Sequence, residues 1–361
     1  MKLNELFIVQ PVLASYRCQF INELSKSFAK VTVFANLKIN NGFKLDVDGD
    51  FEKVHTKLIG SQKWVYYQSG ILWPLLRTRP SYIFVTADLR ALHFWILLFL
   101  CRITGVKIFS HGQGVYDKAR AGFIRKTLFK IVMLFSTKYV CYTNSVKKSL
   151  TNIGINSKKL MVMDNTIKNE FYVEPNHKDE FANRVLFVGR LRDGSNMELF
   201  FDALTLLKKK GINFTTDIVG DGSQSSHYKE LAKESELDII FHGSIYEDKK
   251  IAQLSKKAVI GVYPGDAGLS IVHYMSLSIV PIIHNDLLKH MGPEPSYIKD
   301  GVNGLLFSRN DKNSLATNIE LALNNKELSL EIATNAFRTY KKLLEPSMAE
   351  KLLLEMEITN V

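Results

Sequence analysis

The chain has 361 residues, of which 46% are apolar and 23% charged, so it is long enough for two globular domains and its composition argues against a disordered or fibrous protein. Its three cysteines, Cys18, Cys101 and Cys141, have neither metal-ligand spacing nor an even disulfide pattern, which argues against a disulfide scaffold and favours a reducing compartment. The net charge of +11 is unevenly placed: residues 61–160 hold 16 Lys and Arg against 2 Asp and Glu, which favours an anionic partner for this half of the chain.

The N-terminal sequence MKLNELFIVQP lacks the features of a secretory signal, so we interpret it as a first strand and expect a cytoplasmic protein. Short apolar runs then alternate with helical patterns: a helix over about 16–28, the runs KVTVFAN and YIFVTAD, a helix near 89–104, and the runs KIFSHG, YVCYT and KLMVMDN. This order predicts an α/β domain with a parallel sheet covered on both faces. The apolar stretch in ALHFWILLFLCRITG is too short to span a bilayer, which needs about 20 residues, and is expected to be a buried helix.

The second half repeats this alternation with the strands RVLFVG, TTDIVG, DIIFHG, AVIGVYP and VPIIHN and with helices over 196–210, 225–235, 247–257 and 268–277. Residues 166–182 are polar, aperiodic and interrupted by proline, as a linker is. We therefore expect a Rossmann-like domain over 1–168, a linker over 169–182, a second Rossmann-like domain over 183–335, and C-terminal helices over 336–361 that return to the first domain. Ligands of such sheets bind beyond the carboxyl ends of the strands.

Glycines recur at the carboxyl ends of the strands expected in the second domain. They are Gly189, Gly220, Gly222, Gly243, Gly265 and Gly268. One glycine there is typical of a tight turn, but the recurrence favours backbone amides that approach a ligand closely, and the helix starts that follow favour an anion. This pattern predicts a bound diphosphate.

In FVGRLRDGSN, Arg190 and Arg192 follow the first of these strands, near the expected phosphates. A guanidinium there would clamp phosphate oxygens and stabilise the negative charge of a leaving diphosphate. The alternative is a surface arginine paired with Asp193.

The segments FVGRL, DIVGDG, FHGSI, YPGDAGLSIVHYM and DGVNGLLF, in this order and spacing, resemble the donor domain of retaining GT-B glycosyltransferases of the family 4 kind. The resemblance covers nearly the whole chain, with specific matches in the second half and general ones in the first. It implies two Rossmann-like domains facing across a cleft, a nucleotide-sugar donor of the UDP or GDP type on the second domain, an acceptor on the first, retention at the anomeric carbon, and neither a cofactor nor a metal.

Two positions depart from the family pattern. The family's two glutamates fall here on Gly265 and His273, so Asp266 or Glu294 would have to meet the donor sugar, and His273 the ribose unless it is a structural histidine. The family's phosphate-binding lysine falls on Ser195, where Arg192 would restore the charge. The expected donor-binding residues are thus Gly189, Arg190, Arg192, Ser195, Gly220, Gly222, Gly243, Gly265, Asp266, Ala267, Gly268, Leu269, Ser270, His273 and Glu294.

In the first half, KIFSHGQGVY places His111 at a strand end, where the family has a comparable histidine near the reacting centre. We expect His111, Arg190 and Asp266 to be catalytic, with a structural strand-end histidine as the alternative for His111. The expected acceptor-binding residues are Ser15, Tyr16, Arg17, Gly112 and Gln113, although helix capping explains Ser15 equally well.

The segment 118–138 combines six basic residues with large apolar ones, a composition typical of a helix that lies on an anionic membrane. The alternative is an amphipathic core helix with a solvated basic face. The leading interpretation is a metal-independent, retaining hexosyltransferase, peripheral at the inner face of the cytoplasmic membrane, that extends a lipid-linked or oligosaccharide acceptor in capsule or lipopolysaccharide assembly.

Two other functions remain open. A non-catalytic nucleotide-sugar-binding or partner subunit would explain the missing glutamate pair, and a nucleotide-sugar epimerase of the same fold would need carboxylates for proton transfer. We expect no nucleic-acid partner, because no helix-turn-helix or RNA-binding signature is present.

Overall fold

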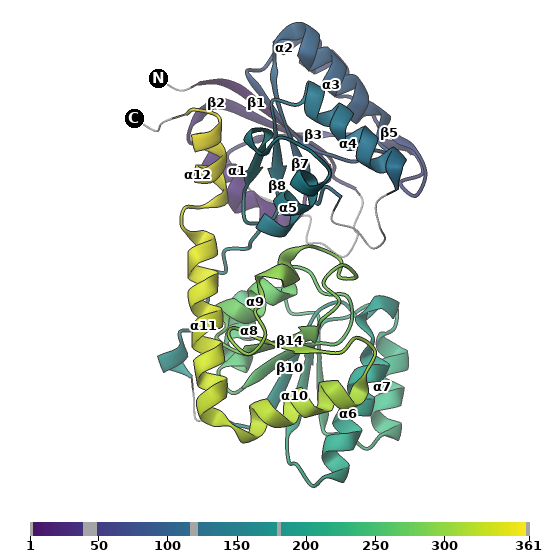
Figure 1. The fold of residues 1–361 in the computed structure, drawn as a ribbon, viewed down its shortest axis with the longest axis vertical. Coiled ribbons are helices and arrows are strands. Elements are labelled where there is room, and N and C mark those ends of the chain that lie inside the picture. Colours follow the sequence, from purple (N-terminus) through teal and green to yellow (C-terminus); the bar gives the residue numbers. More distant parts are fainter. Residues whose placement is uncertain (1–2, 39–48, 116–121, 179–181, 359–361) are drawn as a thin grey trace. The chain divides into compact units, whose positions relative to one another are not determined.

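The computed structural model describes residues 3–38, 49–115, 122–178 and 182–358. The chain divides into two compact units (Figure 1): unit 1 comprises residues 1–165 and 346–361, and unit 2 comprises residues 166–345. Both are α/β units built on parallel sheets, as the sequence predicts.

Unit 1 contains a seven-stranded parallel sheet with the order β3-β2-β1-β6-β7-β8-β9. Its strands are β1 (Leu3–Val12), β2 (Phe28–Asn36), β3 (Glu52–His55), β6 (Tyr82–Thr86), β7 (Lys107–Gly112), β8 (Lys138–Cys141) and β9 (Leu160–Val162). A separate antiparallel hairpin joins β4 (Leu58–Gly60) to β5 (Tyr66–Gln68). The central strands are buried on both faces, which explains their nearly continuous apolar runs.

Helices cover both faces of this sheet. One apolar layer packs α1 (Cys18–Ser25) and the C-terminal α12 (Met348–Glu355) on one face, and a second layer packs the remaining helices on the other. These are α2 (Leu72–Thr78), α3 (Leu92–Thr104), α4 (Phe123–Phe135) and α5 (Asn144–Asn152). The short 3-10 turns are η1 (Ser15–Arg17) and η2 (Ser157–Lys159).

The helix α3 corrects one expectation. The sequence predicts a buried helix, but only one side of α3 enters the core, and a stripe of large apolar residues on its other side is exposed. Within the described ranges of the chain, none of the helices combines the length and apolar content needed to cross a bilayer.

Unit 2 contains a six-stranded parallel sheet with the order β12-β11-β10-β13-β14-β15. Its strands are β10 (Arg184–Val188), β11 (Thr215–Val219), β12 (Ile239–Gly243), β13 (Ile260–Tyr263), β14 (Val280–His284) and β15 (Leu305–Phe307). Numbered from β10, this is the order 3-2-1-4-5-6 of a Rossmann sheet, so the direction of winding reverses between β10 and β13. A crevice for a ligand is expected at the carboxyl ends of these two strands.

The helices of unit 2 lie in two layers. Figure 1 shows α6, α7 and α10 on one side of the sheet and α8 and α9 on the other, and α11 packs on α9. The bounds are α6 (Met197–Lys209), α7 (Ser225–Glu234), α8 (Asp248–Ser255), α9 (Ser270–Ser276), α10 (Lys312–Asn324) and α11 (Lys326–Leu344), with 3-10 turns η3 (Pro175–His177), η4 (Asp193–Ser195) and η5 (Glu294–Tyr297).

The unit boundaries differ from the expected ones in two places. The expected linker, 169–182, packs on unit 2 in its described part: Asn169 bonds to Tyr340 and Ser276, and Val173 enters the core. Polar side chains bonded to the core carry no hydrophobic periodicity, so the segment resembles a linker in sequence. The return to unit 1 starts at Pro346 and not at 336, because α11 is one continuous helix that belongs to unit 2.

Candidate functional site

The candidate site lies at the carboxyl ends of β10 and β13 in unit 2. Tyr274 of α9 holds these strand ends apart: its hydroxyl accepts the amide proton of Val188 at 3.0 Å and donates to the carbonyl of Val262 at 3.1 Å. The ring lies against Gly261, where a Cβ would come within 2.7 Å of it. A phenol thus replaces a direct backbone bond between the strands, and the sheet is open at its switch point.

The loops that follow these strands pack backbone against backbone. A Cβ on Gly220 would overlap the carbonyl of Gly189, one on Gly222 that of Leu191, and one on Gly265 that of Gly194. Glycine is required there because the loops touch one another. The packing of the loops therefore accounts for glycine at these three positions without a ligand, which is a different reason from the one expected from the sequence.

Three of the glycine amides at these strand ends are already bonded within the protein. Gly189 donates to Val219, Gly220 to Gly243, and Gly222 to its neighbour's carboxylate on Asp221. A further strand-end glycine, Gly243, has a positive φ of 67° and open space where a Cβ would be. This positive φ by itself favours glycine at position 243, so no ligand is needed to explain the residue.

The start of α9 is different. The amide of Asp266 donates to Gly194 at 3.1 Å and that of Ala267 to His290 Nδ1 at 2.9 Å. Among the described residues, the next three amides donate to no partner, and these belong to Gly268, Leu269 and Ser270. Three successive amides at the positive end of a helix form an anion-binding arrangement.

Arg190 is exposed and Arg192 is half-buried on the loop after β10. The Arg192 guanidinium lies over Gly194 and donates from Nη2 to Met291 Sδ, while the carboxylate of Asp193 accepts from Gln224. Arg192 therefore does not form the simple surface pair with Asp193 that was its alternative.

Ser195 is fully buried, and its hydroxyl donates to the carbonyl of Arg192 and accepts from the amide of the same residue. This side chain stabilises the turn η4. It is not available to a ligand, which corrects its place among the expected donor-binding side chains.

Two side-chain nitrogen donors, which the sequence analysis did not single out, hold the carboxylate of Asp266. His284 Nε2 and Arg309 Nη2 both lie 3.4 Å from the same oxygen, Oδ1. The other oxygen, Oδ2, accepts no bond from the described residues, and the side chain is 25% exposed. Asp266 is thus oriented through one oxygen with the second unengaged.

His290 fixes the bend beneath Asp266. Its Nδ1 accepts from Ala267, and its Nε2 donates to the carbonyl of His284 at 3.0 Å, so the ring is a neutral Nε2–H tautomer. Burial lowers its pKa to about 3, and the neighbouring His284 adds to the shift. The imidazole therefore acts as a fixed structural bridge between the β13 and β14 loops.

His273 and Glu294 lie in more enclosed places than expected. The Nε2 atom of His273 is buried without a hydrogen-bond partner among the described residues, and burial lowers the pKa of the ring to about 4. Glu294 is 3% exposed, and its carboxylate folds back onto Gly292. Both positions limit the access of a ligand to these side chains in this arrangement of the loops.

The first-half candidates lie at strand ends of unit 1. His111 is buried between Thr86 Oγ1 and the Tyr142 hydroxyl, each 3.2 Å from a ring nitrogen, and stacks on Phe84. Burial, with a contribution from the charge of Arg17, holds the pKa of His111 well below its usual value. The surroundings of His111 thus favour the neutral imidazole over the cation.

Among the expected acceptor residues, Tyr16 and Gln113 are exposed, whereas Arg17 is buried between the rings of Tyr16 and Tyr142. The turn at Ser15 begins without a side-chain cap. Gly112 is enclosed, and a Cβ there would meet the Tyr139 hydroxyl at 3.2 Å. Exposed side chains for an acceptor are therefore fewer than the sequence suggested.

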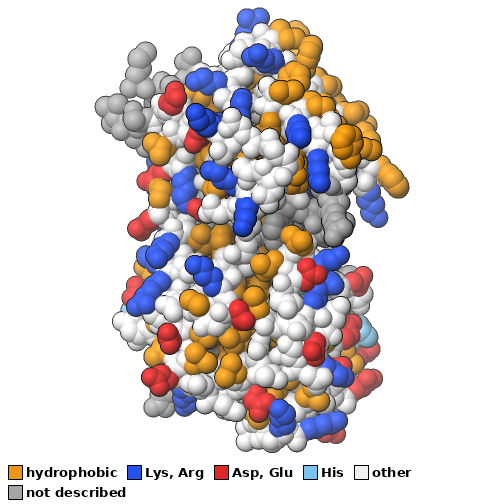
Figure 2. Space-filling view, viewed as in Figure 1, with side chains coloured by type: hydrophobic (Ala, Val, Ile, Leu, Met, Phe, Trp, Pro, Cys, Tyr) orange, Lys and Arg blue, Asp and Glu red, His pale blue; other side chains and the backbone are white. Residues whose placement is uncertain are grey.

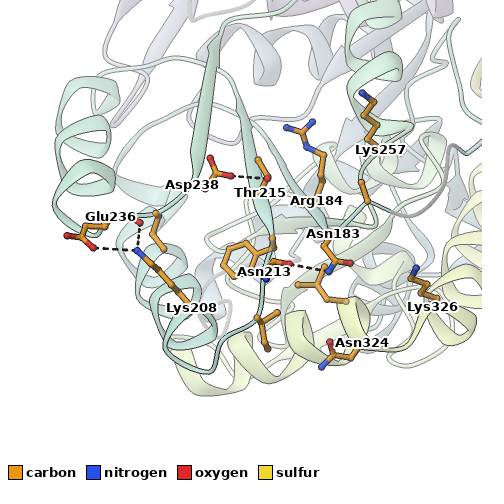
Figure 3. A pocket seen from close by; sticks show the side chains of 15 residues that line it. Asn183, Arg184, Lys208, Asn213, Thr215, Glu236, Asp238, Lys257, Asn324 and Lys326 are labelled. Atoms are coloured by element: carbon orange, nitrogen blue, oxygen red, sulfur yellow. Dashed lines mark hydrogen bonds and ion pairs between the residues drawn. The ribbon is translucent and has the colours of Figure 1, made fainter.

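A broad hollow opens at the opposite end of the unit 2 sheet (Figure 3). Its polar groups bond one another: Asn183 donates to Asn213 at 3.1 Å, Thr215 to Asp238 at 3.0 Å, and Lys208 to Glu236. It lies at the amino ends of β10 and β11, away from the switch point. We do not assign the donor to it.

Several residues of this site were missed from the sequence: His284, His290, Met291 and Arg309. Gly261 is the signal that could have revealed the role of Tyr274, since a glycine inside a strand marks the close approach of another group. Among the described residues, no three His, Cys, Asp or Glu side chains are grouped as metal ligands are.

Residues 168–339 match the family model described as glycosyl transferases group 1. A curated relative, the Campylobacter jejuni α-1,4-N-acetyl-D-galactosaminyltransferase that acts on GalNAc-α-(1->4)-GalNAc-α-(1->3)-diNAcBac-PP-undecaprenol, is 25% identical over 44% of this chain and 43% of its own. The chain spans about half the length of the curated relatives it matches.

Solved structures match over almost the whole chain. A glycosyltransferase from Rickettsia africae has a TM-score of 0.74 at 17% identity and covers 99% of both chains. HepE of Anabaena, crystallised with UDP and glucose, has a TM-score of 0.68 at 15% identity and covers 98% of this chain and 100% of its own. The group 1 match covers a little under half of the chain, within unit 2, and the likeness to these solved structures shows that the chain has the GT-B fold.

Proposed function

We propose that the chain is a retaining glycosyltransferase that moves a hexose-type sugar from a nucleotide-sugar donor to a glycan acceptor in surface-polysaccharide assembly. The observation that carries this proposal is the open switch point of unit 2. Three successive amides at the start of α9 donate to none of the described residues there, and Arg190 and Arg192 follow β10. Backbone amides at a helix start and guanidinium groups both bind diphosphate oxygens.

The proposed donor is of the UDP or GDP type. UDP is favoured because structures of HepE are described with UDP and with UDP-glucose. The diphosphate would meet the amides of Gly268, Leu269 and Ser270, with Arg190 and Arg192 supplying positive charge beside it. Positive charge matters most on the leaving side, because the transfer creates a new negative charge on the departing diphosphate.

Asp266 is the proposed contact to the donor sugar. Its Oδ1 is fixed by His284 and Arg309, and its Oδ2, which accepts no bond within the described ranges, would accept from a sugar hydroxyl. His273 is proposed to meet the ribose after a small movement, since its Nε2 is buried and has no hydrogen-bond partner in the part of the chain that the structure describes. Glu294 is kept as the second choice for the sugar because its carboxylate is folded back.

The proposed reaction is a front-side displacement. The bond from the anomeric carbon to the phosphate oxygen breaks, a bond from this carbon to the acceptor oxygen forms on the same face, and the phosphate oxygen takes the acceptor's proton. This path needs charge stabilisation and orientation and does not need a protein base. A neutral, buried His111 is consistent with such a path and would act as a positioning group, and we propose that no metal or cofactor takes part.

The acceptor is proposed to be lipid-linked and to bind unit 1, near the exposed side chains of Tyr16 and Gln113. The C. jejuni relative is described as acting on an undecaprenol-linked glycan. A lipid-linked acceptor would place the enzyme at the inner face of the cytoplasmic membrane. The positive charge of the basic segment 118–138 would attract the anionic lipids of this membrane. Two of its basic residues, Lys118 and Arg120, lie outside the described residues.

One observation favours a second candidate, a non-catalytic donor-binding subunit: the positions of the family's two carboxylates are occupied by Gly265 and His273, and neither supplies a negative charge. The epimerase is less favoured, because the carboxylate at the switch point, Asp266, is already bonded to His284 and Arg309.

The test is a panel of nucleotide sugars, screened by thermal shift and then by transfer to a lipid-linked acceptor, with the anomeric configuration of the product read by NMR. A rise in melting temperature with one UDP or GDP sugar and a product of unchanged configuration would support the proposal. Binding without transfer and without donor hydrolysis would support the non-catalytic donor-binding subunit. A donor whose sugar has been inverted at one carbon would support the epimerase. An unchanged melting temperature with every donor would overturn all three functions.

A further inference from the structure

Unit 1 exposes large apolar side chains on several of its elements. Large apolar side chains are exposed on α2, α3, the start of α4 and the β4–β5 hairpin, which together we name the α2–α4 face. Figure 2 shows hydrophobic side chains mixed with Lys and Arg along the part of unit 1 where Figure 1 places α2, α3 and α4. Extended apolar patches of this kind mark surfaces that bind a partner.

The helix α3 carries the centre of this face. Leu92, Ile96, Phe99 and Ile103 are between 37% and 66% exposed and recur every three to four residues, so they form one stripe along the outer side. The inner side of the same helix is buried in the core of unit 1. The stripe is thus held on a packed helix, and exposing it does not depend on a change of fold.

Tryptophan flanks the stripe. Of the three tryptophans of the chain, Trp64 at the tip of the β4–β5 hairpin is 79% exposed and Trp73 on α2 is 73% exposed. Tryptophan is enriched where a protein meets the boundary between lipid headgroups and acyl chains, because its ring is apolar and its N–H needs a polar partner.

The charge on this face has one sign. Lys63, Arg77, Arg79, Arg102 and Lys126 are exposed around the apolar residues. Among the described residues between 56 and 138, the one carboxylate is Asp88, and it is already bonded to Arg90 at 2.9 Å. A second copy of the chain on this face would bring cations against cations, whereas an anionic lipid surface would neutralise them.

We propose that the α2–α4 face docks on an anionic lipid bilayer, with the α3 stripe inserted among the upper acyl chains, Trp64 and Trp73 at the headgroup level, and the surrounding cations on lipid phosphates. The proposal deepens the proposed function and rests on it in one respect: the bilayer is the one that presents the lipid-linked acceptor. It assigns insertion to α3 in addition to the electrostatic attraction expected of the basic segment 118–138.

The experiment compares the full-length chain with the variant L92Q/I96Q/F99Q/I103Q in flotation with vesicles of phosphatidylethanolamine and phosphatidylglycerol, and with vesicles of phosphatidylcholine alone. Glutamine keeps the helix propensity, and these side chains are outside the core. The matched control is L288Q/V302Q/L321Q/L330Q, which removes four exposed apolar side chains from unit 2. Quenching of tryptophan emission by lipids brominated on the acyl chains reports insertion.

We expect the unaltered chain and the control to float with the anionic vesicles and to be quenched, and the α3 variant to bind at least about tenfold more weakly without quenching. Equal binding by the α3 variant, binding without quenching, or no vesicle binding at all would each overturn the proposal. So would a dimer, seen by light scattering, that the α3 variant abolishes. Nucleotide-sugar binding by each variant is measured separately, so a failure to dock is distinguished from a failure of the proposed function.

Discussion

The imidazole rings of His284 and His290 lie face to face, with centroids 3.7 Å apart and planes within 5° of parallel. Two protonated rings at this separation would repel strongly, and each ring is also withdrawn from water. Burial accordingly lowers the pKa of both histidines, that of His290 to about 3. The neutral pair ties the bend after β13 to the end of β14, so the bend that holds Asp266 depends on both rings staying uncharged.

This pair predicts a loss of stability in acid. The pKa of His290 in the folded protein lies below its unfolded value of about 6.5. The contribution of the neutral ring to the free energy of unfolding is therefore fully present above pH 6.5 and is lost as the pH falls from there toward about 3. Replacing His290 by Gln should remove about 1.4 kcal/mol per pH unit from the slope of unfolding free energy against pH in this range. Urea unfolding at a series of pH values measures the slope.

The control for this prediction is His227→Gln, since the side chain of His227 is 55% exposed. The control should have the slope of the unaltered chain. Equal slopes for the unaltered chain and the His290 variant would contradict the assignment of the acid sensitivity to this ring.

A second prediction concerns the Tyr274 hydroxyl, which bridges the separated ends of β10 and β13. Tyr274→Phe keeps the ring against Gly261 but leaves the Val188 amide and the Val262 carbonyl without the hydroxyl that bridges them. A buried polar group left without a partner costs about 1–3 kcal/mol, so the free energy of unfolding should fall by this amount. The control Tyr246→Phe changes a side chain that is 65% exposed and should change the free energy of unfolding little. An equal effect of the two substitutions would contradict the bridging role of the Tyr274 hydroxyl.

Much of the fold of unit 2 could be predicted from its sequence, because its strands are short apolar runs that end at glycine, proline or asparagine. The predicted helix over 196–210 is observed as Met197–Lys209. The half-exposed state of α3 could not be predicted, since nearly every position of this helix is apolar and its periodicity does not distinguish an inner from an outer side.

The candidate site was predictable only in part. The strand-end loops and the arginines follow from the alternation of strands and helices, but the reason for the glycines does not. Gly220 and Gly265 are needed by neighbouring loops, a contact between segments distant in sequence. The bonds from His284 and Arg309 to Asp266 likewise join separate strand ends, and no local pattern marks them.

The loop packing yields a third prediction. Gly265→Ala would place a methyl group on the carbonyl of Gly194, which is backbone and cannot move away alone, whereas Gly268→Ala meets only the end of Met291 at 3.8 Å. We expect Gly265→Ala to lower the free energy of unfolding by about 1–3 kcal/mol and Gly268→Ala to change it by less than about 0.5 kcal/mol. Chemical unfolding tests both, and equal effects would show that the loops do not pack as described.

The last prediction addresses the phosphate clamp. Arg190→Ala, Arg192→Ala and the double variant remove positive charge from the loop after β10, which is proposed to bind the diphosphate together with the amides at the start of α9. If a guanidinium stabilises the departing diphosphate, turnover should fall at least about tenfold in one of the three, which corresponds to about 1.4 kcal/mol of barrier. The control Arg338→Ala removes an exposed arginine from α11 and should leave turnover unchanged. Because loss of the charge raises the barrier to departure of the diphosphate as well as weakening its binding, the decrease should persist at saturating donor. Unchanged turnover in all three variants would remove both arginines from the mechanism and leave the amides of α9 as the sole groups proposed to bind the diphosphate.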